Sequence, residues 1–213
     1  MIFPPGVPLS KRIFDLTSTI LGSIILSPLL LTLAVLVRLK NGTPIFYKQQ
    51  RPGFKGNPFF IYKFRSMTDA RDSEGNLLPD DKRLTGFGRF IRSTSMDEWP
   101  EMINILKGEM SWVGPRPLLM QYLDRYSPEQ MRRHDVLPGV TGWAQVNGRN
   151  ALTWQEKFRL DVWYVDHWSF WLDVRIVWMS IGKVIRREGI SQEGHATSEE
   201  FMGNESQNGE KSA

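Results

Sequence analysis

The sequence of 213 residues contains no cysteine and only three histidines. The lack of cysteine excludes disulfides, thiolate nucleophiles and cysteine-ligated zinc, although it does not identify a cellular compartment. The histidines, His134, His167 and His195, do not follow the spacing of metal ligands. A histidine-based metal site or catalytic triad is therefore not expected. The sequence also shows no internal repeat.

The positive charge is concentrated in the first 187 residues. The formal net charge is +4, but the segment from Glu188 onward holds six acidic residues and one lysine, which leaves 26 basic and 17 acidic side chains before it. A basic body suits a phosphate-bearing partner: nucleic acid, phospholipid or a diphosphate substrate. Composition alone does not choose among them.

A long uncharged run, from Leu16 to Val37, is rich in Leu, Ile and Val. As a helix it would be about 33 Å long, roughly one hydrocarbon thickness. A cleaved signal peptide fits poorly because the run is too long and no small-residue cleavage site follows. A buried helix of a soluble protein is the alternative. Asp15 lies at the polar edge of the run, where we expect it to pair with Lys11 or Arg12.

Two features of the same run bear on its topology. Ser27-Pro28 lies at its midpoint, where proline removes a hydrogen bond and predicts a kink or break. Both flanks are basic, so a spanning helix would place one of them on the unfavoured side of the membrane. A segment that turns at Ser27-Pro28 and returns satisfies both flanks. Since spanning helices also tolerate proline, these residues leave both topologies open.

Residues 43–67 are typical of extended structure. We expect strands over 43–49 and 59–67, joined by a turn rich in Gly and Pro. Alternation in the second strand separates two faces, which are Phe60, Tyr62 and Phe64 on one side and Ile61, Lys63 and Arg65 on the other. The face with Lys63 and Arg65 is either solvated or directed into an anion site. Residues 69–83, polar and rich in Gly and Asp, predict a mobile loop.

Helices are predicted in the second half of the chain. Ser127 and Thr153 each begin a capping box, and the second box opens a helix to about His167. A last helix over 170–187 carries Trp171 and Trp178 and ends in basic residues, so it either lies on a membrane or packs on the core. We divide the chain into a membrane segment (1–40), a catalytic domain (41–190) and a polar, mostly disordered tail (191–213).

The densest group of candidate chemistry begins at Ser95-Met96-Asp97-Glu98. Ser95 and Glu98 have the spacing of a capping box, which places Asp97 and Glu98 in the first turn of a helix. The positive end of the helix dipole would there favour the ionised carboxylates. Taken alone, these residues are explained by capping, and a catalytic pair is the competing hypothesis.

Neighbouring residues favour the catalytic hypothesis. Arg92 precedes the pair, and Arg116 follows between two prolines that restrict its backbone. The loop at 138–150 combines glycines with an aromatic residue, Gln145 and Arg149. Such a loop suits a nucleotide, although it also suits an ordinary turn-rich connection.

These stretches together resemble the small monotopic phosphoglycosyl transferases of bacteria, the bacterial sugar transferase group, over about residues 8–202. The matching stretches are Lys11-Arg12-Ile13-Phe14-Asp15, Ser27-Pro28, Gln50-Arg51-Pro52-Gly53, Lys63-Phe64-Arg65-Ser66-Met67, Asp97-Glu98-Trp99-Pro100, Val113-Gly114-Pro115-Arg116-Pro117 and residues 138–149. The chain is most similar to the bacillosaminyl-phosphate transferases, which move N-acetylated sugar phosphates, and residues 191–195 agree with them. Where those proteins commonly have Leu, this chain has Met96 and Trp99.

The resemblance implies an α+β fold, mostly helical, with a small β-hairpin and a re-entrant membrane helix broken at the Ser-Pro pair. It also implies a catalytic domain that faces the cytoplasm from the bacterial inner membrane. The expected reaction moves a sugar 1-phosphate from a UDP-sugar to polyprenyl (undecaprenyl) phosphate and releases UMP, as the first membrane step of glycoconjugate assembly. Asp97 would be the nucleophile and would form a phosphosugar–aspartyl intermediate.

This chemistry brings anions together, so it needs cations. We expect Mg²⁺, held by Asp97, Glu98 or both together with the substrate phosphates. Glu98 is otherwise a proton acceptor or a cap. The residues that the resemblance and the strand pattern place in the substrate pocket are Lys63, Arg65, Arg92, Arg116, Gln145 and Arg149.

Two other functions compete with this one. The first is a membrane-tethered domain that binds phosphates or nucleic acid without catalysis. The sequence lacks a long basic helix and a strand with stacked exposed rings, so nucleic acid is not expected as a partner. The second is a glycosyltransferase that releases UDP. The sequence names neither the sugar nor the oligomeric state.

Overall fold

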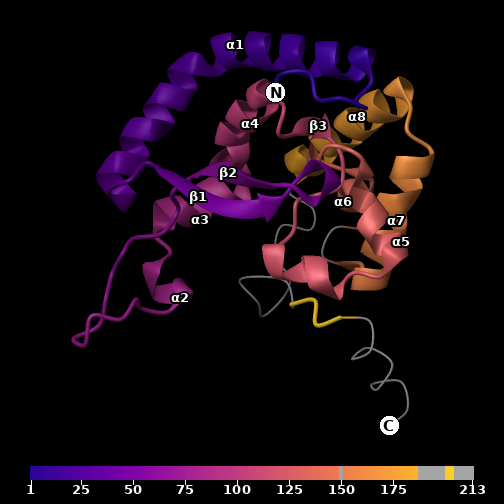
Figure 1. Ribbon diagram of the computed structural model, residues 1–213. Helices are drawn as coiled ribbons and strands as arrows, with labels where there is room; N and C mark the ends of the chain where they lie inside the picture. Colours follow the sequence, from indigo (N-terminus) through magenta and orange to yellow (C-terminus); the bar gives the residue numbers. More distant parts are fainter. Residues whose placement is uncertain (149–150, 187–199, 204–213) are drawn as a thin grey trace.

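The computed structural model describes residues 1–148, 151–186 and 200–203. A long helix, α1 (Leu9–Asn41), arches over the rest of the protein, and α4 (Met102–Lys107) and α8 (Phe170–Arg186) lie beneath it (Figure 1). The elements are mostly helical with two small two-stranded sheets, in agreement with the predicted α+β class. The helix α1 ends one residue beyond the predicted boundary at residue 40.

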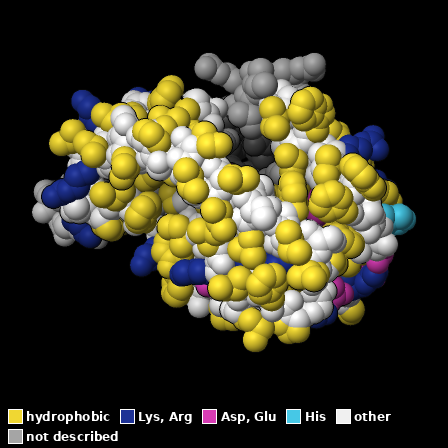
Figure 2. All heavy atoms as spheres, turned by 90° about the horizontal axis from the view of Figure 1, so that it is seen from above, with side chains coloured by type: hydrophobic (Ala, Val, Ile, Leu, Met, Phe, Trp, Pro, Cys, Tyr) yellow, Lys and Arg dark blue, Asp and Glu magenta, His cyan; other side chains and the backbone are white. Residues whose placement is uncertain are grey.

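Within the described residues, α1 is the one helix long and apolar enough to cross a membrane by length and composition. It continues as helix through Pro28, and Figure 1 shows that its axis bends partway along. The face of α1 that points away from the body is apolar and exposed, with Ile24, Ile25 and Leu31 among its residues. Seen from this side, hydrophobic side chains predominate on the molecule (Figure 2). The prediction of a kink agrees with this bend, but the predicted break at the Ser-Pro pair is wrong, since α1 is one continuous helix.

The β-hairpin follows α1. Strand β1 (Phe46–Pro52) pairs antiparallel with β2 (Pro58–Phe64) through the short helix η1 (Phe54–Gly56). The first strand begins three residues later than predicted, because Pro44 has no N–H to join the ladder. Residues 69–79 form an irregular arm, closed by a bridge between Arg71 and Leu77, which leads to α2 (Asp80–Arg83) and extends away from the body (Figure 1).

The remaining elements build the two sides of the body. Those after the arm are α3 (Gly86–Ser93), η2 (Met96–Glu101), α4, β3 (Ser111–Val113) and η3 (Met120–Arg125). Those of the C-terminal part are α5 (Pro128–Met131), η4 (Arg132–Asp135), β4 (Gly139–Thr141), α6 (Trp143–Val146), α7 (Trp154–Asp166) and α8. Strands β3 and β4 pair in parallel. Both predicted capping boxes, at Ser127 and Thr153, are confirmed.

The N-terminal end of α1 is fixed by buried charges, which we call the anchor: Lys11, Arg12, Asp15 and Asp173. Lys11 Nζ lies 2.5 Å from Asp173 Oδ2 on α8 and donates to the carbonyl of Val113 at 2.8 Å. Arg12 Nη2 donates to the carbonyl of Ile105 at 2.6 Å.

The partner predicted for Asp15 is wrong. Its Oδ1 accepts hydrogen bonds from Ser111 Oγ at 3.0 Å and from the backbone N–H of Trp112 at 3.2 Å. The two cations that precede Asp15 reach other partners instead, because helical geometry turns them toward α8 and α4. Pairing of Lys11 with a residue 162 positions away holds α1 to the C-terminal helix.

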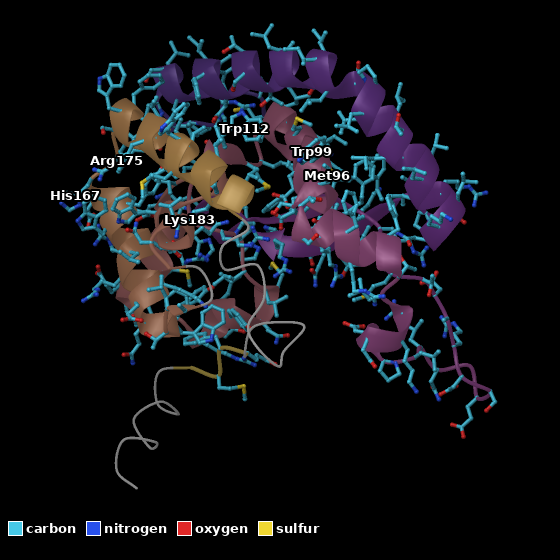
Figure 3. All side chains as sticks on the ribbon, turned by 180° about the vertical axis from the view of Figure 1, so that it is seen from behind. Met96, Trp99, Trp112, His167, Arg175 and Lys183 are labelled. Atoms are coloured by element: carbon cyan, nitrogen blue, oxygen red, sulfur yellow. The ribbon has the colours of Figure 1, made fainter. Side chains whose placement is uncertain are left out.

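The C-terminal end of α1 packs on the same body. Leu33 and Val37 are buried with Phe64 of β2 and Ile91 of α3, and Met96 and Trp99 pack against this cluster. Figure 3 shows Met96, Trp99 and Trp112 on the side of the body that faces α1. Both ends of α1 are therefore joined to one body, although a straight helix of this length would separate them by about 50 Å.

The predicted polar tail contains a buried residue. Phe201 is fully buried among Tyr122, Tyr126, Trp154 and Phe158, and its N–H donates to Tyr122 Oη at 3.1 Å. Residues 187–199 and 204–213, on which the prediction of disorder mainly falls, lie outside the described residues.

Candidate active site

A cleft of about 880 Å³ opens between the β-hairpin, η2 and the segments around Arg116 and α7. Strand alternation sends Lys63 of β2 toward this cleft, in line with the predicted face. The cleft also has an apolar side, where Phe46, Tyr122 and Trp154 contribute rings. Eight basic residues of the described part of the chain line the cleft, together with the carboxylates of Asp69, Asp80, Asp97, Glu98 and Asp161.

The predicted capping box at Ser95 is wrong. Ser95 adopts a left-handed conformation with φ of 55°, and its side chain makes no cap hydrogen bond. Asp97 and Glu98 instead lie in η2, a short 3₁₀ helix that runs into α4. The carboxylate of Glu98 forms ion pairs with Lys63 and Arg116, so it does not accept the cap hydrogen bond from the backbone N–H of Ser95.

Glu98 joins two cations from different elements. Lys63 Nζ lies 2.6 Å from Glu98 Oε1, and the Arg116 guanidinium forms an ion pair with the same carboxylate. Burial alone would raise the pKa of Glu98, but Arg116 and Lys63 hold it far below its usual value. Glu98 is therefore ionised throughout the physiological range and keeps both cations at the floor of the cleft.

Asp97 differs from its neighbour in having no ionic partner. Among the described residues its carboxylate accepts no hydrogen bond and forms no ion pair, although it lines the cleft. Burial, and then the nearby charge of Glu98, raise the pKa of Asp97 to about 6. The helix-dipole argument predicted stabilised anions at both positions, and for Asp97 the loss of hydration is the larger effect. The result is a carboxylate that is ionised near neutral pH yet poorly solvated.

A third carboxylate, Glu101, was not predicted from the sequence as a site residue. It is buried, and its Oε1 lies 3.3 Å from Lys63 Nζ without the geometry of a hydrogen bond. Burial and the charge of Glu98 raise the pKa of Glu101 to about 8. The spacing from Glu98 to Glu101, one turn of helix, was the available signal. Glu101 adds a neutral carboxyl group behind the cleft near pH 7.

Most of the predicted binding residues meet at the cleft. Lys63, Arg65, Arg92, Arg116 and Gln145 all line it. Arg92 Nε donates to Ser66 Oγ at 2.8 Å, and the buried Oε1 of Gln145 has no hydrogen-bond partner in the described part of the chain.

Two of the predicted binding residues need separate comment. The guanidinium of Arg65 pairs with Asp69 and donates to the carbonyls of Thr43 and Met67. Several of its N–H donors are therefore engaged within the protein. Its substrate-binding role stays a prediction. Arg149 lies outside the described residues.

The loop that carries Arg116 depends on close backbone packing. A Cβ atom at Gly114 would lie 2.2 Å from the carbonyl oxygen of Leu137. The carbonyl of Arg116 accepts a hydrogen bond from Arg133 Nη2 at 2.7 Å, and Arg133 is itself neutralised by buried Asp161. These contacts constrain the backbone from which the Arg116 side chain leaves; the rigidity expected from the flanking prolines stays a prediction.

The acidic residues fit a cation that is shared with a substrate. No group of three or more His, Asp or Glu side chains suited to a metal occurs among the described residues. Asp97 offers a partner-free carboxylate to the cleft, whereas the oxygens of Glu98 are largely engaged by Lys63 and Arg116. Mg²⁺ commonly takes one or two carboxylates and completes its shell with phosphate oxygens and water. Asp97 suits that role better than Glu98 does.

Comparison with known proteins gives a consistent set of relatives. The family model described as bacterial sugar transferase matches residues 7–187. An uncharacterized sugar transferase, EpsL, of Bacillus subtilis (strain 168) is 58% identical over 91% of this chain and 96% of its own length. The undecaprenyl-phosphate glucose phosphotransferase of Komagataeibacter xylinus is 41% identical over 83% of this chain and 36% of its own length. The undecaprenyl-phosphate galactose phosphotransferase of Salmonella typhimurium is 39% identical over 84% of this chain and 41% of its own length.

Proposed function

The chain belongs to the bacterial sugar transferase family, and from this premise we propose that it moves a sugar 1-phosphate from a UDP-sugar to undecaprenyl phosphate and releases UMP. The names of the glucose and galactose phosphotransferases support this reaction class. Those relatives are more than twice as long as this chain, while EpsL has nearly the same extent. The proposal therefore concerns the part that they share.

The observation that carries the proposal is the partner-free carboxylate of Asp97 in a cation-lined cleft. An Asp97 oxygen attacks the phosphorus that bears the sugar, and the bond from that phosphorus to the UMP oxygen breaks with its electron pair leaving on UMP. A phosphate oxygen of undecaprenyl phosphate then attacks the same phosphorus. The aspartyl–phosphorus bond breaks, and the Asp97 carboxylate is restored.

The surrounding residues lower the cost of joining two anions. Lys63 and Arg116, held in place by Glu98, present positive charge where the transferred phosphate gains negative charge. Arg92, hydrogen-bonded to Ser66, contributes a further cation to the same wall. Mg²⁺, held by Asp97 and the substrate phosphates, would neutralise part of the diphosphate charge. Glu98 in this mechanism positions cations and is not a base.

The helix α1 supports a re-entrant attachment to the membrane. Both of its ends make buried contacts with one body, through Lys11 at one end and Asn41, whose Nδ2 donates to the carbonyl of Arg65 at 2.6 Å, at the other. A helix that spanned a membrane would place one of these ends on the opposite side from that body. We place the body on the cytoplasmic side of the bacterial inner membrane, where UDP-sugars are made.

A product assay tests the function. Purified protein with Mg²⁺, undecaprenyl phosphate and a panel of UDP-sugars should release UMP with at least one donor, and Asp97→Asn should abolish this release. Asp124→Asn is the matched control, because Asp124 is exposed and does not line the cleft. Without undecaprenyl phosphate, mass spectrometry should find a phosphosugar adduct on Asp97.

Each competing function has its own outcome in this assay. Release of UDP would identify a glycosyltransferase, and binding of nucleotide without turnover would identify a non-catalytic domain. Retained turnover in Asp97→Asn would remove Asp97 as the nucleophile. The donor that reacts decides the subtype: an N-acetylated deoxygenated sugar supports the bacillosaminyl prediction, and glucose or galactose supports the activities named for the relatives.

A further inference from the structure

Strand β1 contributes a row of side chains to the cleft that the proposed mechanism does not use. Tyr47, Gln49 and Arg51 alternate along the strand and all line the cleft. Because successive residues of a strand face opposite sides, the intervening Lys48 and Gln50 do not line it. Gln49 and Arg51 lie opposite Ile61 and Phe59 of β2. Because Ile61 and Phe59 are buried, this part of the cleft is backed by the protein core.

Arg51 is held in position but not neutralised. Its Nη2 donates to Gln49 Oε1 at 2.6 Å, and the described residues provide it with no acidic partner. A guanidinium has five N–H donors, so this one hydrogen bond leaves donors of Arg51, which lines the cleft, available to a ligand. Burial, and then the like charge of Arg116, lower the pKa of Arg51, although a guanidinium stays charged at any physiological pH.

Arg133, which has a structural role in the same region, differs from Arg51 in its partners. Its guanidinium is almost completely buried, pairs with Asp161 at 2.7 Å and supports the carbonyl of Arg116. Arg51 has an amide where Arg133 has a carboxylate. Two guanidinium groups that repel each other across a cleft destabilise the empty cleft, and an anion bound between them removes this repulsion.

We propose that Arg51 is a substrate-binding residue that, with Arg116, grips the diphosphate of the nucleotide sugar, and that Gln49 positions it. The inference rests on the proposed function for the identity of the substrate. A diphosphate carries enough charge and enough oxygens to accept hydrogen bonds from both planar guanidinium groups. Arg116 is also tied to Glu98 beside the nucleophile, so Arg51 supplies the cation without a competing carboxylate.

Steady-state kinetics of Arg51→Gln test the proposal against the control Lys48→Gln. The control removes the same charge from the same strand, at an exposed residue outside the cleft. In a ping-pong reaction, kcat/KM for the UDP-sugar reports the first half-reaction and kcat/KM for undecaprenyl phosphate reports the second. Arg51→Gln should lower the first about 10- to 100-fold, the usual worth of a charge-assisted hydrogen bond, and leave the second unchanged.

The conservative variant separates charge from bidentate geometry. Arg51→Lys should recover part of the donor kcat/KM, because lysine keeps the charge but not the planar fork. Circular dichroism should match the wild type for both variants. A loss confined to undecaprenyl phosphate, or equal donor values in Arg51→Gln and Lys48→Gln, would overturn the proposal.

A binding measurement separates this proposal from the proposed function. Inorganic pyrophosphate with Mg²⁺ is titrated into detergent-solubilised protein, with no turnover required. Weaker pyrophosphate binding in Arg51→Gln than in Lys48→Gln supports the diphosphate grip even if no UDP-sugar yields UMP. Equal affinities in the two variants reject the grip, whatever the wild type catalyses.

Discussion

The anchor and the cleft both hold charges with little access to water, but they treat these charges differently. In the anchor, the ammonium of Lys11 meets the carboxylate of Asp173, and Tyr164 and Trp168 donate hydrogen bonds to the same carboxylate. In the cleft, Asp97 and Arg51 form no ion pair within the described residues, although groups that can carry the opposite charge lie near both. The ion pair of Lys11 with Asp173 serves the fold, whereas the charges of Asp97 and Arg51 are available to a ligand.

The comparison predicts opposite effects on stability in the two regions. The largest effect is expected in the anchor. Lys11→Met leaves Asp173 buried and unpaired, which should lower the free energy of unfolding by about 3–5 kcal/mol. Thermal unfolding in detergent measures this loss. Lys55→Met, which breaks an exposed pair with Asp135, should cost at most about 1 kcal/mol.

A second change in the anchor sharpens the result. Lys11→Met combined with Asp173→Leu removes both charges, so it should be more stable than Lys11→Met alone. If the single and double variants unfold at the same temperature, the buried charge of Asp173 is not the source of the loss.

In the cleft, removal of a charge should stabilise the fold. The pKa of Asp97 is raised to about 6, so the native state holds its proton more tightly than the unfolded state does. Ionisation therefore destabilises the wild type progressively between about pH 4 and pH 6, and the full penalty remains above that range. Asp97→Asn should raise the unfolding temperature by a few degrees at pH 8 while it abolishes UMP release.

The pH dependence is the check on this second prediction. Melting curves recorded with chelator and without substrate should show the advantage of Asp97→Asn at pH 8 and its disappearance near pH 4. An equal advantage at both pH values would mean that the variant acts through packing. Below pH 6 the wild type should also lose activity, because a protonated Asp97 is a poor nucleophile.

Sequence patterns predicted features that depend on near neighbours. The capping boxes at Ser127 and Thr153, the alternation that brings Lys63 to the cleft, and the long apolar helix all follow from local spacing. The candidate active site was found in the same way, because its acidic and basic residues lie in short motifs. Of its predicted members, Arg149 falls outside the described residues.

Features that depend on contacts between distant residues were not predictable in this way. Periodicity carries no information about which of many acids Lys11 meets, and Asp173 is 162 residues away. Ser95 has a left-handed backbone without a cap hydrogen bond, and the residues that follow it, Met96 and Trp99, pack against Leu33 and Val37 of α1, contacts that a local capping pattern does not contain. Phe201 was missed because it is a lone aromatic residue in a polar tail, and only the aromatic cluster on η3 and α7 gives it a place.

The smallest effect is expected where α1 and the body meet, at Trp112. Its Nε1 donates to Ser18 Oγ on α1 at 2.9 Å, a single neutral hydrogen bond at a half-buried position. Trp112→Phe and Ser18→Ala should each lower the free energy of unfolding by about 1 kcal/mol through loss of this bond. The double variant should then lose little more than either single variant, so a double-mutant cycle yields a coupling energy of about 1 kcal/mol. Additive losses would show that the bond does not couple α1 to the body, and the stability of that junction would then rest on the charges of the anchor.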